Sequence, residues 1–155
     1  MSVAFVLNGA AVAAPIEAGS PLLAALRGPL GLSGPRYGCG AEQCGACLVL
    51  VDGAPAYACT MQAGAVAGRA VTTVEGLGTP EAPHPLQQAF LDFQSGQCGF
   101  CLSGILLRAA VLLRDNPNPT AHDVRVALDP HLCRCGSHNR IIRAVLAAAD
   151  RMATA

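Results

Sequence analysis

The sequence has no tryptophan and no lysine, and its ten basic residues, all arginine, are balanced by ten acidic ones. Charged residues make up only 13% of the chain. A neutral chain of this kind offers neither the broad basic surface of a nucleic-acid-binding protein nor a strongly acidic one. We therefore expect no nucleic-acid partner.

Long apolar runs are also missing, although hydrophobic residues make up 52% of the chain. No run approaches the roughly 18–20 residues that cross a bilayer, so we expect no direct membrane insertion. The stretch Met1–Ala14 lacks a basic start, and Asn8-Gly9 interrupts it where a signal peptide needs a continuous apolar segment. The sequence thus predicts no signal peptide of its own.

Eight cysteines are the most informative feature that is present. Disulfide frameworks are typical of small secreted chains that cannot build an apolar core, and this chain has no shortage of apolar residues. The cysteines are also tightly clustered, and Cys133 and Cys135, one residue apart, are poor disulfide partners for each other. Metal or cluster binding is therefore the favoured interpretation.

The first 74 residues carry strand patterns and one helix signal. Asn8-Gly9 is a two-residue hairpin signal. Ser20 followed by Pro21 is typical of a helix N-cap and the first helical residue, and we expect this helix to reach Leu26. The predicted strands are Val3–Leu7, Val12–Ile16, Cys47–Val51, Ala56–Thr60 and Val71–Val74.

Beyond a linker rich in proline and glycine at 75–84, the apolar residues recur with helical period. We predict an α+β chain with a strand-rich domain at 1–74 and a helical domain at 85–155. The expected helices contain Leu86–Phe93, Leu102–Leu113, Thr120–Leu128 and Ile141–Ala149.

The first group of cysteines has the spacing Cys-x4-Cys-x2-Cys with a distant fourth member, as in plant-type [2Fe–2S] ferredoxins. A cluster with four thiolates is anionic, and glycines beside the cysteines let backbone N–H groups approach the sulfurs. Structural zinc sites usually use paired Cys-x2–4-Cys knuckles, so this spacing favours a cluster over zinc. The Cys39 set, as we call it, is Cys39, Cys44, Cys47 and Cys59.

The second group combines Cys-x2-Cys with Cys-x-Cys. The first pair alone would also fit a redox dithiol. However, Cys98 is expected at the end of one helix, and the other members are expected at the ends of neighbouring helices, so that all four can converge on one cluster. The Cys98 set is Cys98, Cys101, Cys133 and Cys135.

Together these motifs resemble the small iron–sulfur subunit of the molybdenum hydroxylases, the xanthine oxidase and aldehyde oxidoreductase family. The resemblance covers nearly the whole chain. It rests on Gly38-Cys39-Gly40-x3-Cys44-Gly45-Ala46-Cys47, Val51-Asp52-Gly53, Cys59, Thr73-Val74-Glu75-Gly76-Leu77, Gln97-Cys98-Gly99-Phe100-Cys101-x2-Gly104, Asn116-Pro117-x-Pro119-Thr120 and Leu132-Cys133-Arg134-Cys135-Gly136.

The resemblance implies a fold and a role for each set. A β-grasp, plant-type ferredoxin-like domain would hold one [2Fe–2S] cluster on the Cys39 set, and a four-helix domain would hold the other on the Cys98 set. Gln97 matches the residue whose amide contacts the molybdopterin, and Cys135 matches the ligand nearest to it. The molybdopterin itself would be held by a separate large subunit, from which electrons reach the Cys98 set first and the Cys39 set second.

This chain would then transfer electrons without catalytic residues of its own, while the complex oxidises an aldehyde or an N-heteroaromatic substrate. Its partners would be the large molybdenum subunit, together with a cytochrome c or FAD subunit that accepts the electrons. The expected location is the cytoplasm, or the periplasm or a membrane surface after export with the partner.

The sequence departs from the common family pattern at two places. The family sequence Cys-Arg-Cys-Thr-Gly-Tyr is replaced by a variant beginning Cys135-Gly136-Ser137-His138, which is similar to the isoquinoline, nicotinate and membrane-associated aldehyde dehydrogenase branch. In the Cys39 set, Glu42 stands where glycine is usual.

Simpler interpretations remain open at this point. The chain could be a free-standing two-cluster ferredoxin or a zinc-stabilised adaptor. Gln97 could be only a polar residue at a helix end, and Arg134, between two candidate ligands, could either raise a cluster potential or pair with a partner. We expect His84, His122 and His131 to be solvated.

Overall fold

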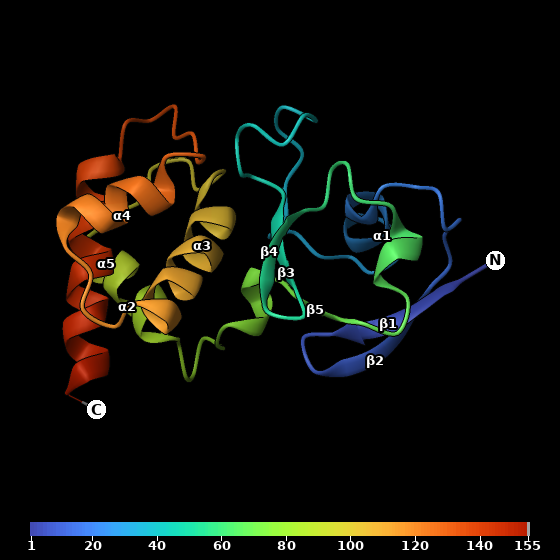
Figure 1. Cartoon of the computed structure of the whole chain (residues 1–155), viewed down its shortest axis with the longest axis horizontal. Helices are drawn as coiled ribbons and strands as arrows, with labels where there is room; N and C mark the ends of the chain where they lie inside the picture. The colour runs from blue at the N-terminus through green and yellow to red at the C-terminus, as the bar shows by residue number, and fades with distance from the viewer. Residues whose placement is uncertain (155) are drawn as a thin grey trace.

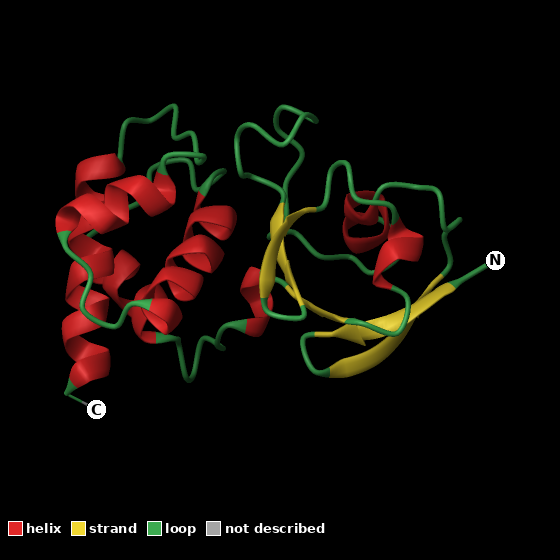
Figure 2. Cartoon of the chain, viewed as in Figure 1, coloured by secondary structure: helices red, strands yellow, loops and turns green. Residues whose placement is uncertain are grey.

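The computed structural model describes residues 1–154, with the strands and the long helices in separate halves (Figure 1; Figure 2). The N-terminal half combines a sheet with one short helix and two 3-10 turns. Its elements are β1 (Val3–Leu7), β2 (Ala10–Ala14), α1 (Leu22–Arg27), β3 (Leu48–Val51), β4 (Ala54–Tyr57), η1 (Ala63–Val66), β5 (Ala70–Thr72) and η2 (Val74–Gly76).

The five strands form one mixed sheet in the order β2-β1-β5-β3-β4. Strands β1 and β5 are parallel, and the other neighbours are antiparallel. Leu22 and Leu26 of α1 are fully buried with Phe5 and Val49 of the sheet, in the same apolar core. A mixed sheet that packs against a helix confirms the ferredoxin-like fold expected for this half.

Two hairpins begin their second strand earlier than the sequence predicted. Strand β2 starts at Ala10 rather than Val12, and β4 starts at Ala54 rather than Ala56. The turns Asn8-Gly9 and Asp52-Gly53 have positive φ at both residues. Such two-residue turns close the hairpin at once, so that pairing resumes at the next residue.

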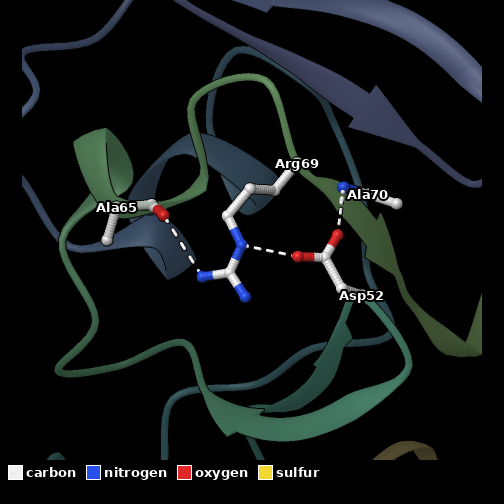
Figure 3. Close-up of polar contacts among 4 residues, drawn as sticks. All are labelled: Asp52, Ala65, Arg69 and Ala70. Carbon is white, nitrogen blue, oxygen red and sulfur yellow. Dashed lines mark hydrogen bonds and ion pairs between the residues drawn. The ribbon is translucent and has the colours of Figure 1, made fainter.

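The turn between β3 and β4 is anchored to β5 by the Asp52 carboxylate (Figure 3). Asp52 accepts hydrogen bonds from the backbone N–H of Ala70 at 2.9 Å and from Nε of Arg69 at 2.7 Å. Arg69 in turn donates to the carbonyl of Ala65 at 3.5 Å. These contacts stabilise the β3–β4 hairpin, which Cys47 precedes and Cys59 follows.

Helix α1 does not use the predicted cap. Its N-cap is Pro21, without a side-chain hydrogen bond, and the helix begins at Leu22. Pro21 has extended backbone angles and pairs with Gln62 in an isolated β-bridge. Because this bridge holds Pro21 outside the helix, the prediction of Ser20 as N-cap is wrong.

The C-terminal half is a bundle of four helices around a second apolar core. Thr120 caps α4 through a reciprocal pair of contacts with Asp123, as its position before the helix predicted. No helix within residues 1–154 has the length and apolar composition of a membrane span. The four helices are α2 (Pro85–Asp92), α3 (Leu102–Asp115), α4 (Ala121–Leu128) and α5 (His138–Ala153).

Helix α3 joins the two halves and lies beside β3 and β4 in Figure 1. Leu107 of α3 packs with Leu48 and Leu50 in a third apolar cluster. At Gly104, an added Cβ would fall 2.0 Å from the carbonyl oxygen of Gly45. The backbone of α3 therefore touches the backbone of the loop that carries Cys39 and Cys44.

Candidate iron–sulfur centres

The β3–β4 hairpin brings together two members of the Cys39 set. Cys47 directly precedes β3 and Cys59 follows β4, and the pairing of Leu48 with Tyr57 places them at the same end. Both thiols are buried. Burial raises the pKa of Cys47 to about 12, so a thiolate at this position needs a metal cation to stabilise it.

The other two members lie in the loop before β3, where the backbone turns its N–H groups toward sulfur. Ala41 and Gln43 donate to Cys39 Sγ at 3.3 and 3.2 Å, and the N–H of Cys39 donates to Cys44 Sγ at 3.3 Å. The first two hydrogen bonds lower the pKa of Cys39 to about 7. The loop thus already stabilises negative charge on sulfur, as an anionic cluster requires.

Glu42, the departure from the family glycine, lies in this loop with φ of +60°. Residues other than glycine adopt this left-handed conformation at a cost. The carboxylate of Glu42 accepts a hydrogen bond from the Thr60 hydroxyl, next to Cys59. That contact helps to hold the loop in the conformation that glycine would adopt freely.

The Cys98 set comes from two loops, α2–α3 and α4–α5, rather than from four helix ends. Helix α2 ends at Asp92, so the prediction that Cys98 lies at a helix end is wrong. Gln94, with φ of +47°, turns the chain away from α2 before the cysteines. Only Cys101 is at a helix terminus, as the N-cap of α3.

Within this set the thiols approach in pairs. The sulfurs of Cys98 and Cys135 are 3.4 Å apart, and the thiols of Cys101 and Cys133 lie within hydrogen-bonding reach of each other. The Cys39 set shows the same pattern, with Cys39 beside Cys44 and Cys47 beside Cys59. In residues 1–154, no group of three His, Cys, Asp or Glu side chains is placed to bind a single metal ion. Thiols that approach in pairs suit a binuclear cluster instead, because each of its two irons takes two protein ligands.

Buried polar atoms without a partner provide a second test of whether the residues fit a cluster. Within residues 1–154 these atoms belong only to Ser103, His131 and Ser137. All three residues lie within four positions of a cysteine of the Cys98 set. Burial raises the pKa of Cys101 to about 12, so this thiol, like Cys47, needs a cation to ionise. The donors, the pairing and the burial all fit a [2Fe–2S] cluster.

Gln97 lies beside the Cys98 set and connects its two loops. Its Nε2 donates to the carbonyl of Cys135 at 3.1 Å. The same side chain lines an open cavity of about 610 Å³, together with Phe90, Leu102 and Arg140. Gln97 is itself exposed, so its amide remains accessible from this cavity.

His131 was expected to be solvated, and this expectation is wrong: only 2% of its surface is exposed. The imidazole packs against Gly45 of the Cys39 loop, and burial lowers its pKa to about 4. Hydropathy carried no signal for this burial, because the contact joins residues far apart in the chain. His122 is exposed and His84 is half-buried, whereas Arg134 and His138 lie at the surface.

The two sets meet across the domain boundary. The N–H of Leu132, next to Cys133, donates to the carbonyl of Cys44 at 3.1 Å. The guanidinium of Arg36 lies over the ring of Phe100, 5.2 Å from its centroid. A cavity of about 410 Å³ is lined by cysteines of both sets: Cys39, Cys44, Cys98, Cys101 and Cys133.

Comparison with known families assigns each half. Residues 5–70 match the 2Fe-2S iron-sulfur cluster binding domain, and residues 73–146 match the [2Fe-2S] binding domain. The chain is 47% identical to a nicotinate dehydrogenase subunit of Pseudomonas putida, covering 93% of this chain and 92% of the relative. It is 43% identical to the alpha subunit of isoquinoline 1-oxidoreductase from Brevundimonas diminuta, covering 96% and 98%.

Among solved structures, the aldehyde oxidoreductase of Desulfovibrio desulfuricans superimposes with a TM-score of 0.94 at 36% identity. The match covers 99% of this chain but 17% of that longer one. Two [2Fe-2S] binding domains in one chain, in the order predicted from the motifs, are thus supported by sequence and by fold.

Proposed function

Because this chain belongs to the iron–sulfur subunits of the molybdenum hydroxylase family, we propose that it conducts electrons through the Cys98 set and then the Cys39 set. When bound, each [2Fe–2S] cluster supplies a one-electron carrier. The eight cysteines of the two sets would be the ligands. The ferredoxin-like domain would span 1–74, the linker 75–84 and the helical domain 85–155.

The observation that carries this proposal is the contact between the two sets. The hydrogen bond from Leu132 to the Cys44 carbonyl, at 3.1 Å, links a residue next to one ligand with another ligand. Gly45 and Gly104 bring the two backbones into van der Waals contact at the same place. These contacts fix the loop that carries Cys39 and Cys44 against the helical domain.

The order of transfer is proposed from the resemblance to the family. Large apolar side chains are exposed beside both sets: Tyr37, two residues before Cys39, is 64% exposed, and Phe100 and Leu132, beside the Cys98 set, are 44% and 62% exposed. An apolar surface of this kind is typical of a subunit interface. We propose that the large molybdenum subunit covers the part beside the Cys98 set, so that Gln97 and Cys135 lie nearest to the molybdopterin.

The substrate class is proposed from the relatives. Their names refer to nicotinate and isoquinoline, both N-heteroaromatic compounds, and to aldehydes. The complex would oxidise one of these classes, and a cytochrome c or FAD subunit would take electrons from the Cys39 set. The chain's own residues bind and space the clusters, and the substrate reacts on the large subunit.

The proposal is tested on the complex purified with its large subunit. We expect about four iron and four acid-labile sulfides per small chain, and two distinguishable low-temperature EPR signals after reduction. Zinc in place of iron, or a single cluster, would overturn it. Purification of the chain as a monomer that holds both clusters would favour a free-standing carrier instead. Reduction of the clusters by nicotinate, isoquinoline or an aldehyde then identifies the substrate class.

A further inference from the structure

Tyr37 is a large aromatic side chain at the surface beside the Cys39 set. It lies two residues before Cys39 and is 64% exposed. The hydroxyl end of its ring packs against Gly40, where an added Cβ would overlap it. The ring is therefore held on the loop that carries Cys39 and Cys44, while most of its surface stays accessible. Exposed aromatic side chains are typical of surfaces that bind another protein.

Two cavities open beside Tyr37 and share Arg27 in their lining. The first has a volume of about 310 Å³ and reaches Cys59, a member of the Cys39 set. The second, of about 330 Å³, is lined by Arg36 and by Phe100 of the helical domain. A molecule seated over Tyr37 would thus contact a candidate cluster ligand. The Tyr37 surface, as we call it, consists of Arg27, Arg36, Tyr37 and Cys59.

The positive charges of both arginines on this surface are not compensated. Nη1 of Arg27 donates to the carbonyls of Ser33 at 3.3 Å and Pro35 at 2.8 Å. Nε of Arg36 donates to the carbonyl of Ser33 at 3.3 Å. These hydrogen bonds to the backbone fix the guanidinium groups without neutralising them. Neither arginine takes part in any of the ion pairs of residues 1–154.

Two carboxylates on neighbouring segments are engaged by other donors. Glu42 accepts a hydrogen bond from the hydroxyl of Thr60. Glu75 accepts hydrogen bonds from the N–H of Gly34 at 2.7 Å and from the hydroxyl of Thr73 at 2.6 Å. A cluster with four thiolates is itself anionic and would repel an acidic protein. The two arginines supply the opposite charge beside it, so that carboxylates are attracted at the Tyr37 surface.

We propose that the Tyr37 surface is the docking site of the electron-accepting protein, whose complementary face carries carboxylates around an apolar side chain. The inference rests on the proposed function, since it presumes a cluster on the Cys39 set. Redox proteins meet through small interfaces, in which complementary charge speeds association. The carboxylates pair with Arg27 and Arg36, and the apolar side chain packs on Tyr37. One electron leaves the reduced cluster and reduces the acceptor, while no proton moves and no covalent bond changes.

The test uses the complex purified with its large subunit, after both clusters have been reduced with dithionite. Stopped-flow absorbance then follows oxidation of the clusters by ferricyanide, an anionic acceptor, or by hexaammineruthenium(III), a cationic one. At low ionic strength, ferricyanide should oxidise the double variant Arg27→Gln with Arg36→Gln about tenfold more slowly than the native complex. This difference should shrink as salt screens the charges. Oxidation by hexaammineruthenium(III) should not become slower.

Arg143→Gln is the matched control. Arg143 is also exposed and takes part in no ion pair of residues 1–154, and its Nε donates to the carbonyl of Asn139 at 3.3 Å. It lies on α5 and lines neither cavity. This variant should be oxidised at the native rate. Arg27→Lys with Arg36→Lys keeps both charges and should also stay close to the native rate.

Poly-L-glutamate serves as the probe for an acidic protein face. It should slow the oxidation of the native complex by ferricyanide, because it occupies the Tyr37 surface. The same amount of monomeric glutamate at equal ionic strength should not. In the double variant Arg27→Gln with Arg36→Gln, the polymer should have little effect. An equal effect of the polymer on the native complex and on this variant would contradict docking at the Tyr37 surface.

Tyr37→Glu is a second variant, for use where the double variant does not hold its clusters. It adds a negative charge at an exposed position and should slow oxidation by ferricyanide. Its control is Val126→Glu on α4, where the side chain is 59% exposed. Equal rates in Tyr37→Glu and Val126→Glu would overturn the inference.

Two further outcomes would also overturn it. One is that ferricyanide oxidises the double variant and Arg143→Gln at the same rate. The other is that the double variant loses its large subunit, which would show that the Tyr37 surface belongs to that interface. Failure of the proposed function is distinct from these results, because the unmodified complex would then itself lack two clusters.

Discussion

Gly45 and His131 are in direct contact across the boundary between the two domains: a Cβ atom at Gly45 would fall 2.2 Å from Nδ1 of the imidazole. Gly45 lies between two cysteines of the Cys39 set, and His131 lies two residues before Cys133. The imidazole therefore packs against the loop of the Cys39 set, and the residue facing it has to be glycine.

Gly45→Ala should weaken the protein for two reasons, because φ at this position is +75° and the new methyl group overlaps the imidazole. The overlap should cost about 1–3 kcal/mol beyond the backbone strain. Gly68→Ala is the control, since Gly68 has φ of +71° but nothing within 4 Å of its Cβ position. The stability of both variants is measured as the temperature at which the visible absorbance of the clusters is lost.

The contact with His131 is tested further by the double variant Gly45→Ala with His131→Ala. Removal of the imidazole provides space for the methyl group, so the double variant should lose less stability than the two single changes added together. Additive losses would contradict direct contact between these residues.

Cys135→Ser should remove or disturb the cluster on the Cys98 set and leave the EPR signal of the other set in place. Turnover of the complex should stop, because electrons would no longer leave the large subunit by the proposed route. Cys39→Ser is the reciprocal change, with loss of the other EPR signal. Normal turnover in Cys135→Ser would show that the proposed electron path is wrong.

Gln97→Ala should slow reduction of the clusters by substrate. Loss of one hydrogen bond at the proposed contact of Gln97 with the molybdopterin corresponds to roughly a tenfold change in rate, since each 1.36 kcal/mol is tenfold. Stopped-flow measurement of cluster bleaching gives this rate. The control is Gln88→Ala, whose amide bonds Asp92 at 2.8 Å on the exposed side of α2. If substrate reduces the clusters at the same rate in the two variants, Gln97 has no special role in electron transfer.

His84 should make the stability of α2 dependent on pH. Its Nδ1 accepts a hydrogen bond from the backbone N–H of Leu86 at 3.1 Å, and only the neutral imidazole can accept this bond. Burial lowers the pKa of His84 below the usual 6.5. Because the folded-state pKa lies below the unfolded one, the stabilisation is complete above pH 6.5 and is lost as the pH falls below it.

The variant His84→Asn keeps a side-chain cap that does not titrate. Melting temperatures measured between pH 8 and pH 5 should fall more steeply for the native protein than for this variant. Parallel curves would show that His84 does not contribute to the pH dependence.

Much of the site was determined by local sequence. Cysteine spacing identified the two sets, Asn8-Gly9 set the first hairpin, and Thr120 marked the start of α4. The hairpin and the cap are confirmed, because a turn or a cap is decided by the conformations of a few consecutive residues. The start of β2 and the N-cap of α1 were misplaced, since the pairing of Leu7 with Ala10 and of Pro21 with Gln62 decided them.

Only the tertiary structure decided how the two sets face each other. Burial of His131, its contact with Gly45, and the approach of Gly104 to the same loop join residues that are dozens of positions apart. The sequence shows which residue types are present, but their contacts depend on how the sheet and the four helices pack.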